Sequence, residues 1–173
     1  YGENDSQIMD FSGDENNGTR SGSSKLNLSN PLLGRGAWTF NSATTDLITV
    51  NDAVELDGMD DLTILMWIYP TTNSGARYLA RKGTTAYTNP YLYQIDGSNK
   101  LYVQAKLANG NSPDGGPSTS AVATNSWNHV VMIYRKNIGF TFYINGTNDG
   151  NSCVGTCDSA LLADTAAMDI GSS

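Results

Sequence analysis

Residues 127–146 constrain the fold of this chain more than any other segment. They begin with Trp127 and an apolar run, pass through a four-residue turn that ends in Gly139, and close with an aromatic run before Asn145 and Gly146. Strand-length runs joined by a Gly-containing turn and followed by an Asn-Gly pair are typical of antiparallel hairpins. The segment therefore predicts a β-meander.

Further strand-like runs recur between clusters of turn residues, and no stretch reads convincingly as a helix. This spacing is the pattern of an all-β sandwich or barrel. The run 62–69 is apolar on both faces, because Leu62 and Ile64 share one face while Leu65 and Trp67 share the other. We therefore expect a central strand, with one face on the core and the other lining a concave surface. The other predicted strands are 37–40, 46–50, 78–83, 91–95, 101–105 and 167–170.

Length and charge limit the classes of protein that fit. With 173 residues the chain suits one domain with a sizeable core, so residues 1–173 are treated as a single domain. The formal net charge is −7 and the pI about 4.4. An acidic surface disfavours nucleic acid and anionic membranes and is compatible with divalent cations. No apolar run approaches the roughly 18 residues of a membrane helix, so no direct membrane insertion is expected.

The two cysteines, Cys153 and Cys157, are separated by three residues. They are open to three interpretations: free thiols, half of a zinc site, or a local disulfide. A zinc site needs two more ligands, and His129 is the single histidine of the chain. The extracellular composition favours a Cys153–Cys157 disulfide, which would fix local shape more than it would stabilise the fold.

Five motifs follow one another in a characteristic order. They are Asp10 to Thr19 with its Ser-Gly and Gly-Thr pairs, Thr63 to Thr71, Arg81 to Gly83 followed by 91–95, the Trp127-Asn-His129 hairpin, and Ala167 to Gly171. In this order they resemble laminin G-like domains of the concanavalin A-like lectin/glucanase superfamily. The resemblance implies an all-β fold, an antiparallel concanavalin A-like jelly-roll sandwich. It also implies a protein that binds, because such domains mostly bind and rarely catalyse.

The chain departs from this family at both ends. The family usually opens with an aromatic strand, of which Tyr1 alone stands near that place, and closes with a strand that would follow Ser173. The resemblance implies that these two strands are neighbours in one sheet. We therefore expect one or both terminal strands to be missing or supplied by another segment. The chain is either part of a larger surface protein or is completed by a neighbouring chain.

Carboxylates are the groups that a glucanase of this superfamily would need, as an acid pair on one strand face. The glutamates are Glu3, Glu15 and Glu55, and none stands in that pattern. Asp60 and Asp61 are adjacent and would point to opposite faces of a strand. We therefore predict no catalytic residue and no enzyme, and interpret His129 as a sheet residue.

Oxygen-bearing side chains alternate in the first loop and predict one structural Ca²⁺. The candidate ligands are Asp10, Ser12, Asp14 and Asn16. The alternative is a solvated turn in which Asp and Asn cap their own backbone. Second-choice acids for a cation are Asp57, Asp60 and Asp61.

Aromatic residues on the predicted strands are candidates for a sugar-stacking platform, although aromatics in strands are more often core. The candidate ligand-binding residues are Trp67, Tyr69, Tyr91, Tyr93, Tyr102 and Gln104. Four sequons, at Asn4, Asn17, Asn27 and Asn145, are candidate glycosylation sites, and this number is about what chance gives.

Two functions from different classes follow. The first is a non-catalytic, extracellular or cell-surface recognition and adhesion module that binds carbohydrate or a surface protein. The alternative is a structural subunit of a cell-surface filament, in which neighbouring copies complete each other by strand exchange.

Overall fold

Two antiparallel sheets face each other and are seen in a computed structural model that describes residues 7–29, 31–34, 36–41, 45–72, 75–83 and 88–172. The eight-stranded sheet has the order β1-β2-β5-β14-β7-β8-β9-β10. Its strands are β1 (Gln7–Ile8), β2 (Gly18–Arg20), β5 (Ile48–Val50), β14 (Met168–Ser172), β7 (Arg77–Lys82), β8 (Tyr91–Ile95), β9 (Leu101–Ala105) and β10 (Asp114–Gly115).

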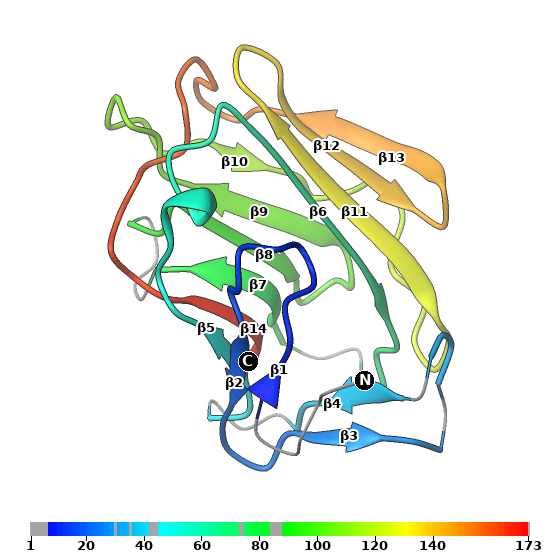
Figure 1. Cartoon of the computed structure of the whole chain (residues 1–173). Coiled ribbons are helices and arrows are strands. Elements are labelled where there is room, and N and C mark those ends of the chain that lie inside the picture. The colour runs from blue at the N-terminus through cyan, green and yellow to red at the C-terminus, as the bar shows by residue number, and fades with distance from the viewer. Residues whose placement is uncertain are drawn as a thin grey trace.

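The four-stranded sheet has the order β13-β12-β11-β6 and carries the hairpin singled out in the sequence. Its strands are β13 (Thr147–Ser152), β12 (Gly139–Ile144), β11 (Asn128–Arg135) and β6 (Asp61–Ile68). In Figure 1 this sheet passes in front of β8, β9 and β10, whereas β14, β5 and β2 lie on the side of β6 that is away from β11. A two-stranded ribbon, β3 (Lys25–Asn27) with β4 (Ala37–Thr39), and a single 3-10 turn, η1 (Val54–Leu56), complete the described elements.

The β11–β12–β13 meander forms as the sequence predicts. β11 pairs with β12 from Val130–Ile144 to Arg135–Gly139 without a break. At the next turn Asn145 and Gly146 have φ angles of 51° and 81°, the two positive values of a type I′ turn. Only residues that tolerate a left-handed backbone fit there, which explains the Asn-Gly pair.

The core lies between β11 and β12 on one side and β8 and β9 on the other. Val130, Met132 and Tyr134 alternate along β11 and are fully buried, because every second side chain of a strand points inward. Tyr134 packs against Phe140 with ring centroids 5.0 Å apart and donates a hydrogen bond to the carbonyl oxygen of Ser159. Burial raises the pKa of Tyr134 to about 12. One continuous apolar cluster therefore joins the two sheets.

The structure confirms the antiparallel concanavalin A-like sandwich and corrects one expectation about it. The run 62–69, predicted to be central, forms β6, and β6 stands last in the four-stranded order with β11 as its partner. Among the described residues no strand pairs with its other edge. The sequence pattern is that of a strand covered on both faces, but β6 is exposed at alternate positions. The sequence pattern depends only on the residues of the strand itself, so it does not show whether a second strand pairs with it.

Candidate functional site

The outward surface of the four-stranded sheet carries exposed apolar side chains. We call this surface the outer face. It is formed by every second residue of three adjacent stretches, so register places the side chains in rows: Leu65 beside Val131 and Tyr143, and Thr63 beside Ile133 and Thr141. Leu65 is 61% exposed, although it lies in the middle of an eight-residue strand. A solvent-facing sheet surface is normally polar, so the exposed apolar side chains make this surface a candidate binding surface.

Aromatic pairs gather at one end of the outer face. Trp67 and His129 are register partners, and their rings lie 5.0 Å apart. Just beyond the strands, Tyr69 and Trp127 meet edge to face at 5.5 Å. Trp67 and Tyr69 are 45% and 37% exposed. We call these four residues the aromatic end. Their rings hold each other in place and remain accessible, which suits stacking on a ligand.

The remaining predicted ligand-binding residues do not join this end. Tyr91 and Tyr93 lie on β8 with 2% and 0% exposure, so the prediction of an exposed stacking surface is wrong for both. They lie in a strand in which every residue except Gln94 is buried, and their rings fill the core. Tyr102 and Gln104 are half-buried on β9 of the opposite sheet. The structure thus divides the predicted set between two sheets.

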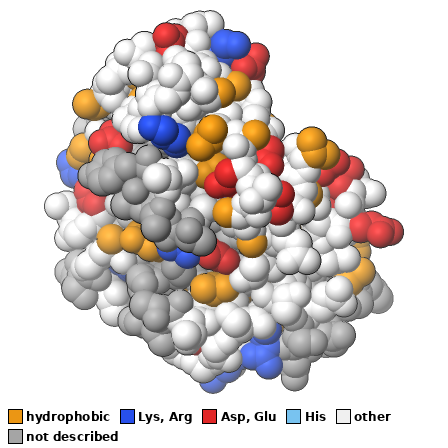
Figure 2. All heavy atoms as spheres, turned by 90° about the vertical axis from the view of Figure 1, so that its left-hand side faces the viewer, with side chains coloured by type: hydrophobic (Ala, Val, Ile, Leu, Met, Phe, Trp, Pro, Cys, Tyr) orange, Lys and Arg blue, Asp and Glu red, His pale blue; other side chains and the backbone are white. Residues whose placement is uncertain are grey.

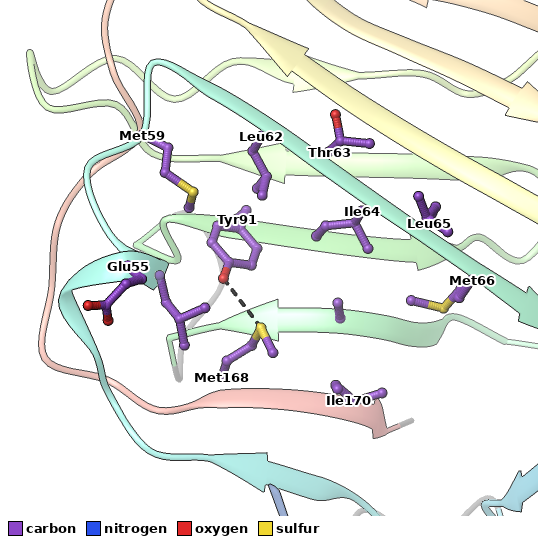
Figure 3. Close-up of a pocket in the computed structure, with 12 residues that line it drawn as sticks. Glu55, Met59, Leu62, Thr63, Ile64, Leu65, Met66, Tyr91, Met168 and Ile170 are labelled. Atoms are coloured by element: carbon purple, nitrogen blue, oxygen red, sulfur yellow. Dashed lines mark hydrogen bonds between the residues drawn. The ribbon is translucent and has the colours of Figure 1, made fainter. Parts of the chain in front are cut away.

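A groove follows the inner side of β6, between the two sheets (Figure 3). It has a volume of about 400 Å³, and its lining is mostly apolar, with Glu55 and Thr63 as the polar members. Leu62, Ile64 and Met66 point into it from β6, and Met168 and Ile170 come from β14 of the other sheet. At its floor the hydroxyl of Tyr91 donates a hydrogen bond to Sδ of Met168, at 3.4 Å. Sequence reasoning missed this groove, although the apolar character of 62–69 on both faces was a signal for it.

A second hollow continues the groove toward the β1–β2 loop. The two hollows share Glu55, Leu56, Met168 and Ile170, so they form one depression. Its far side is lined by Met9, Asp10, Ser12, Asp14 and Asn16. Figure 2 shows this side of the molecule, where hydrophobic side chains lie exposed with Asp and Glu side chains beside them.

The predicted calcium loop brings its oxygens together. The hydroxyl of Ser12 donates to Oδ2 of Asp10 at 2.7 Å and lies 3.5 Å from Oδ2 of Asp14. The carboxylate of Asp10 also accepts the backbone N–H groups of Ser12 and Asn16, at 2.8 and 2.9 Å. The Ser12 hydroxyl and these two N–H groups lower the pKa of Asp10. The loop is therefore a capped turn in which Asp10 accepts hydrogen bonds from its own loop and Asp14 is exposed.

The second-choice acids have other partners. Asp57 lies with Asp52 and Asp164 around Lys82, whose side chain is fully buried. The distances from Nζ of Lys82 to the carboxylate oxygens are 2.5 Å for Asp52, 3.3 Å for Asp57 and 3.6 Å for Asp164. Burial alone would lower the pKa of Lys82, but the hydrogen bond to Asp52 and the charge of Asp57 outweigh it and raise that pKa. The ammonium supplies the positive charge that these carboxylates need. Asp60 pairs with Lys136 at 3.1 Å, and Asp61 is exposed at the start of β6.

Cys153 and Cys157 form the predicted disulfide, with Cα atoms 6.3 Å apart. The bridge closes the segment after β13, next to the turn that follows β11, where the N–H of Asn137 donates to the carbonyl of Cys157. Of the sequons, Asn145 is exposed in its turn, Asn17 and Asn27 are half-buried, and Asn4 lies outside the described residues. Asn145 is therefore the most accessible of the described three.

The comparisons with known proteins agree with this geometry. A laminin G-type model described as the concanavalin A-like lectin/glucanases superfamily matches residues 41–173. The chain belongs to the concanavalin A-like lectin/glucanase superfamily. A search of curated proteins finds no match. No helix among the described residues is long and apolar enough to cross a membrane.

Solved structures with a similar fold are binding domains of toxins. The binding domain of Paraclostridial Mosquitocidal Protein 1 matches with a TM-score of 0.70 and 18% identity, over 96% of this chain and 43% of that one. The receptor binding domain of botulinum neurotoxin D matches with a TM-score of 0.65 and 15% identity, over 95% and 43%. The chain therefore spans less than half of these neighbours, and at such identities the likeness shows the fold alone.

Proposed function

We propose that this chain is a non-catalytic, extracellular recognition and adhesion module that binds surface carbohydrate at the aromatic end of its outer face. The observation that carries this proposal is the pairing of Trp67 with His129 and of Tyr69 with Trp127 on one solvent-facing surface. Aromatic rings stack on the apolar faces of sugar rings. Asn145, whose Oδ1 accepts the backbone N–H of His129 at 2.9 Å, supplies a hydrogen-bonding group beside them.

The structural neighbours support a binding role. Two of them are a binding domain and a receptor binding domain by their own descriptions. A third belongs to botulinum neurotoxin type C, whose cell entry is described as dependent on two ganglioside molecules; it matches with a TM-score of 0.65, 15% identity and 42% coverage of that chain. We therefore expect this chain, which has a sandwich of the same kind, to recognise carbohydrate as well.

The arrangement of acids supports a non-catalytic role. The three carboxylates that converge among the described residues, Asp52, Asp57 and Asp164, are all within reach of the Lys82 ammonium. A glycosidase needs one carboxyl group free to donate a proton and another free to attack or to activate water. A neighbouring ammonium keeps a carboxylate in its ionised form, so these three are poorly suited to donate a proton. The Cys153–Cys157 bridge supports an extracellular location, because disulfides persist in oxidising compartments.

Binding to an immobilised glycan panel tests the carbohydrate proposal. We expect Trp67→Ala and Trp127→Ala each to weaken binding of the best glycan at least about tenfold, as loss of an aromatic anchor does. Phe11→Ala is the matched control, because Phe11 is 75% exposed in the β1–β2 loop and distant in sequence from the outer face. Equal binding by all four proteins, or binding of no glycan, would contradict the proposal.

We also propose that the β1–β2 loop binds one structural Ca²⁺ through Asp10, Ser12, Asp14 and Asn16. The hydroxyl of Ser12 and the Oδ2 atoms of Asp10 and Asp14 lie close together, which supports it. A cation that binds only the folded chain raises the melting temperature by mass action. We expect calcium to raise it relative to chelator, and Asp14→Asn to remove the increase. Magnesium is the control, because it tolerates irregular oxygen sites poorly. An identical melting temperature with calcium and with chelator would refute this site.

A further inference from the structure

The turn between β12 and β13 carries the sequon Asn145-Gly146-Thr147 on an open surface. All three residues are exposed. Apart from its chain neighbours, no described atom lies within 4 Å of the place where a side chain at Gly146 would begin. The Asn-Gly pair forms the type I′ turn described above, so the sequon stands at the tip of a regular hairpin. The described residues therefore leave room around this turn for a glycosylating enzyme.

The side-chain amide of Asn145 is held in one orientation by β11. Its Oδ1 accepts the backbone N–H of His129 at 2.9 Å, and the backbone N–H of Asn145 donates to the carbonyl oxygen of His129 at 2.8 Å. Nδ2 of Asn145 makes no hydrogen bond with any residue that the structure describes. N-glycosylation uses Nδ2 and leaves Oδ1 an acceptor. A sugar can therefore be attached here without breaking the contact with His129.

The two other described sequons are built into the fold. Oδ1 of Asn17 accepts the N–H of Asp10 at 2.8 Å, and Gly18, the middle residue of this sequon, is buried in β2. Asn27 lies in β3, and its Oδ1 accepts the N–H of the third residue of its own sequon at 2.8 Å. Asn17 and Asn27 are both half-buried. Their positions in the fold distinguish these two residues from Asn145.

An aromatic ring stands two residues before Asn145. This ring belongs to Tyr143 of β12, which is half-buried on the outer face and takes part in neither aromatic pair of the aromatic end. The other two described sequons have Glu15 and Lys25 at the corresponding position, and neither side chain offers a ring. The apolar face of a sugar ring packs well on an aromatic side chain. A first sugar on Asn145 would therefore have Tyr143 as its neighbour.

The sequon also adjoins the aromatic end. Trp67 is the register partner of His129, and His129 exchanges two hydrogen bonds with Asn145. The three residues therefore follow one another across β6, β11 and the β12–β13 turn. Neighbouring strands lie about 4.8 Å apart, so Asn145 stands about 10 Å from Trp67. An oligosaccharide of several sugars is longer than this distance, and one attached to Asn145 reaches the rings of the aromatic end.

We infer that Asn145 is an N-glycosylation site, that its first sugar stacks on Tyr143, and that the attached glycan covers the aromatic end. The donor is an oligosaccharide carried on a lipid pyrophosphate. The bond between Nδ2 and sugar C1 forms, the bond between C1 and the pyrophosphate oxygen breaks, and Nδ2 loses one proton. The glycosylated chain then blocks access of external carbohydrate to the aromatic end. The attachment rests on the proposed extracellular location, and the blocking rests on the proposed carbohydrate binding.

Mass spectrometry of the whole chain, secreted from a eukaryotic cell line, tests the attachment. We expect the peptide that contains Asn145 to be glycosylated in most molecules, and the peptides that contain Asn17 and Asn27 to be unmodified in most molecules. Thr147→Val is the matched control, because it removes the hydroxyl that the sequon requires and leaves Asn145 and its turn in place. Unmodified Asn145 in the folded, secreted chain would overturn the inference.

Trimming the glycan to a single N-acetylglucosamine isolates the contact with Tyr143. The single sugar should raise the melting temperature relative to Thr147→Val, and this increase should disappear when both proteins also carry Tyr143→Thr. The four proteins form a double-mutant cycle, which measures the interaction between the sugar and the ring. Tyr143→Phe keeps the ring and should keep the increase, so it replaces Tyr143→Thr if that variant does not fold. An increase that is the same without the ring, or that is lost with Phe, would overturn the stacking.

Acrylamide quenching of tryptophan fluorescence tests the covering of the aromatic end without a known ligand. Two of the three tryptophans, Trp67 and Trp127, lie there. We expect the full glycan to reduce quenching relative to Thr147→Val. On the glycan panel, Thr147→Val should bind at least about tenfold more tightly than the glycosylated chain. Equal quenching of the two proteins would overturn the covering. Reduced quenching supports it, and if neither protein then binds a glycan, that result contradicts the proposed function alone.

Discussion

The two edges of the four-stranded sheet differ in every property that governs strand association. β13 is polar, carries Asp149 and Gly150, and pairs irregularly with β12. β6 is apolar on its inward face, carries Leu65 and Trp67 on its outward face, and pairs regularly with β11 over its whole length. β13 has the polar residues and irregular pairing of a solvent-exposed edge strand, whereas β6 has the composition and regular pairing of an interior strand. The comparison indicates that β6 belongs beside another strand.

The difference extends into the core. Beneath β12, the side chains of Phe140 and Phe142 are 1% and 0% exposed, so the sandwich is closed on that side. Beneath β6, the inward residues remain half-buried and a groove separates them from β14. Among the described residues, β6 therefore differs from β12 in side-chain packing as well as in hydrogen bonding.

The largest expected effect compares inward residues at two distances from the free edge. Met132→Ala in β11 removes a side chain that is 0% exposed and should lower the free energy of unfolding by about 2–5 kcal/mol. Ile64→Ala, its register partner in β6, should cost only about 1 kcal/mol, because its side chain is already half-exposed. Urea unfolding of the two variants measures both values. Equal losses would show that the β6 layer is as closed as the β11 layer.

A charge on the free edge should have an intermediate effect, on association rather than on folding. Leu65→Lys adds a charge in the middle of β6 and should abolish any concentration-dependent association, with stability changed by no more than about 0.5 kcal/mol. Asn151→Lys makes the same change on the polar edge and serves as the control. Light scattering over a concentration series checks this. If Asn151→Lys suppresses association as strongly as Leu65→Lys, the two edges do not differ as described.

The smallest effect concerns the β1–β2 loop, which forms the far side of the depression. The hydroxyl of Ser12 and the N–H groups of Ser12 and Asn16 lower the pKa of Asp10 below its ordinary value of 3.8. A lowered folded-state pKa gives stability that is present above the unfolded value and is lost as pH falls through the folded value. Amide exchange of this loop should therefore accelerate below about pH 4 in the unmodified chain. Asp10→Asn should remove that pH dependence, while β12 should behave alike in both proteins.

The sequence predicted the long, apolar elements well. The hairpin of residues 127–146 and the strands at 91–95 and 101–105 appear where alternation and turn residues placed them. The Cys153–Cys157 bridge is also confirmed. These features depend on local pattern, so a single sequence contains them. Short polar strands such as β2 and β13 were missed, because their pairing is set by neighbours in space and not by their own residues.

Site prediction was less complete for a related reason. An aromatic residue in a strand has the same local pattern whether it faces the core, as Tyr93 does, or solvent, as Trp67 does. Which of the two applies depends on the opposing sheet. The groove beneath β6 is likewise formed by β6 and β14, which are about a hundred residues apart in the chain. The partnership of Lys82 with Asp52 and Asp57 of the β5–β6 connection and with Asp164 before β14 was equally inaccessible to pattern reasoning.

Residue-resolved amide hydrogen exchange of β6 and β13 tests the central claim most directly. The amides of β6 that point away from β11 have no partner among the described residues, so they should exchange as fast as the outward amides of β13, despite the length and apolar character of β6. Outward β6 amides that exchange much more slowly than those of β13 would contradict the account.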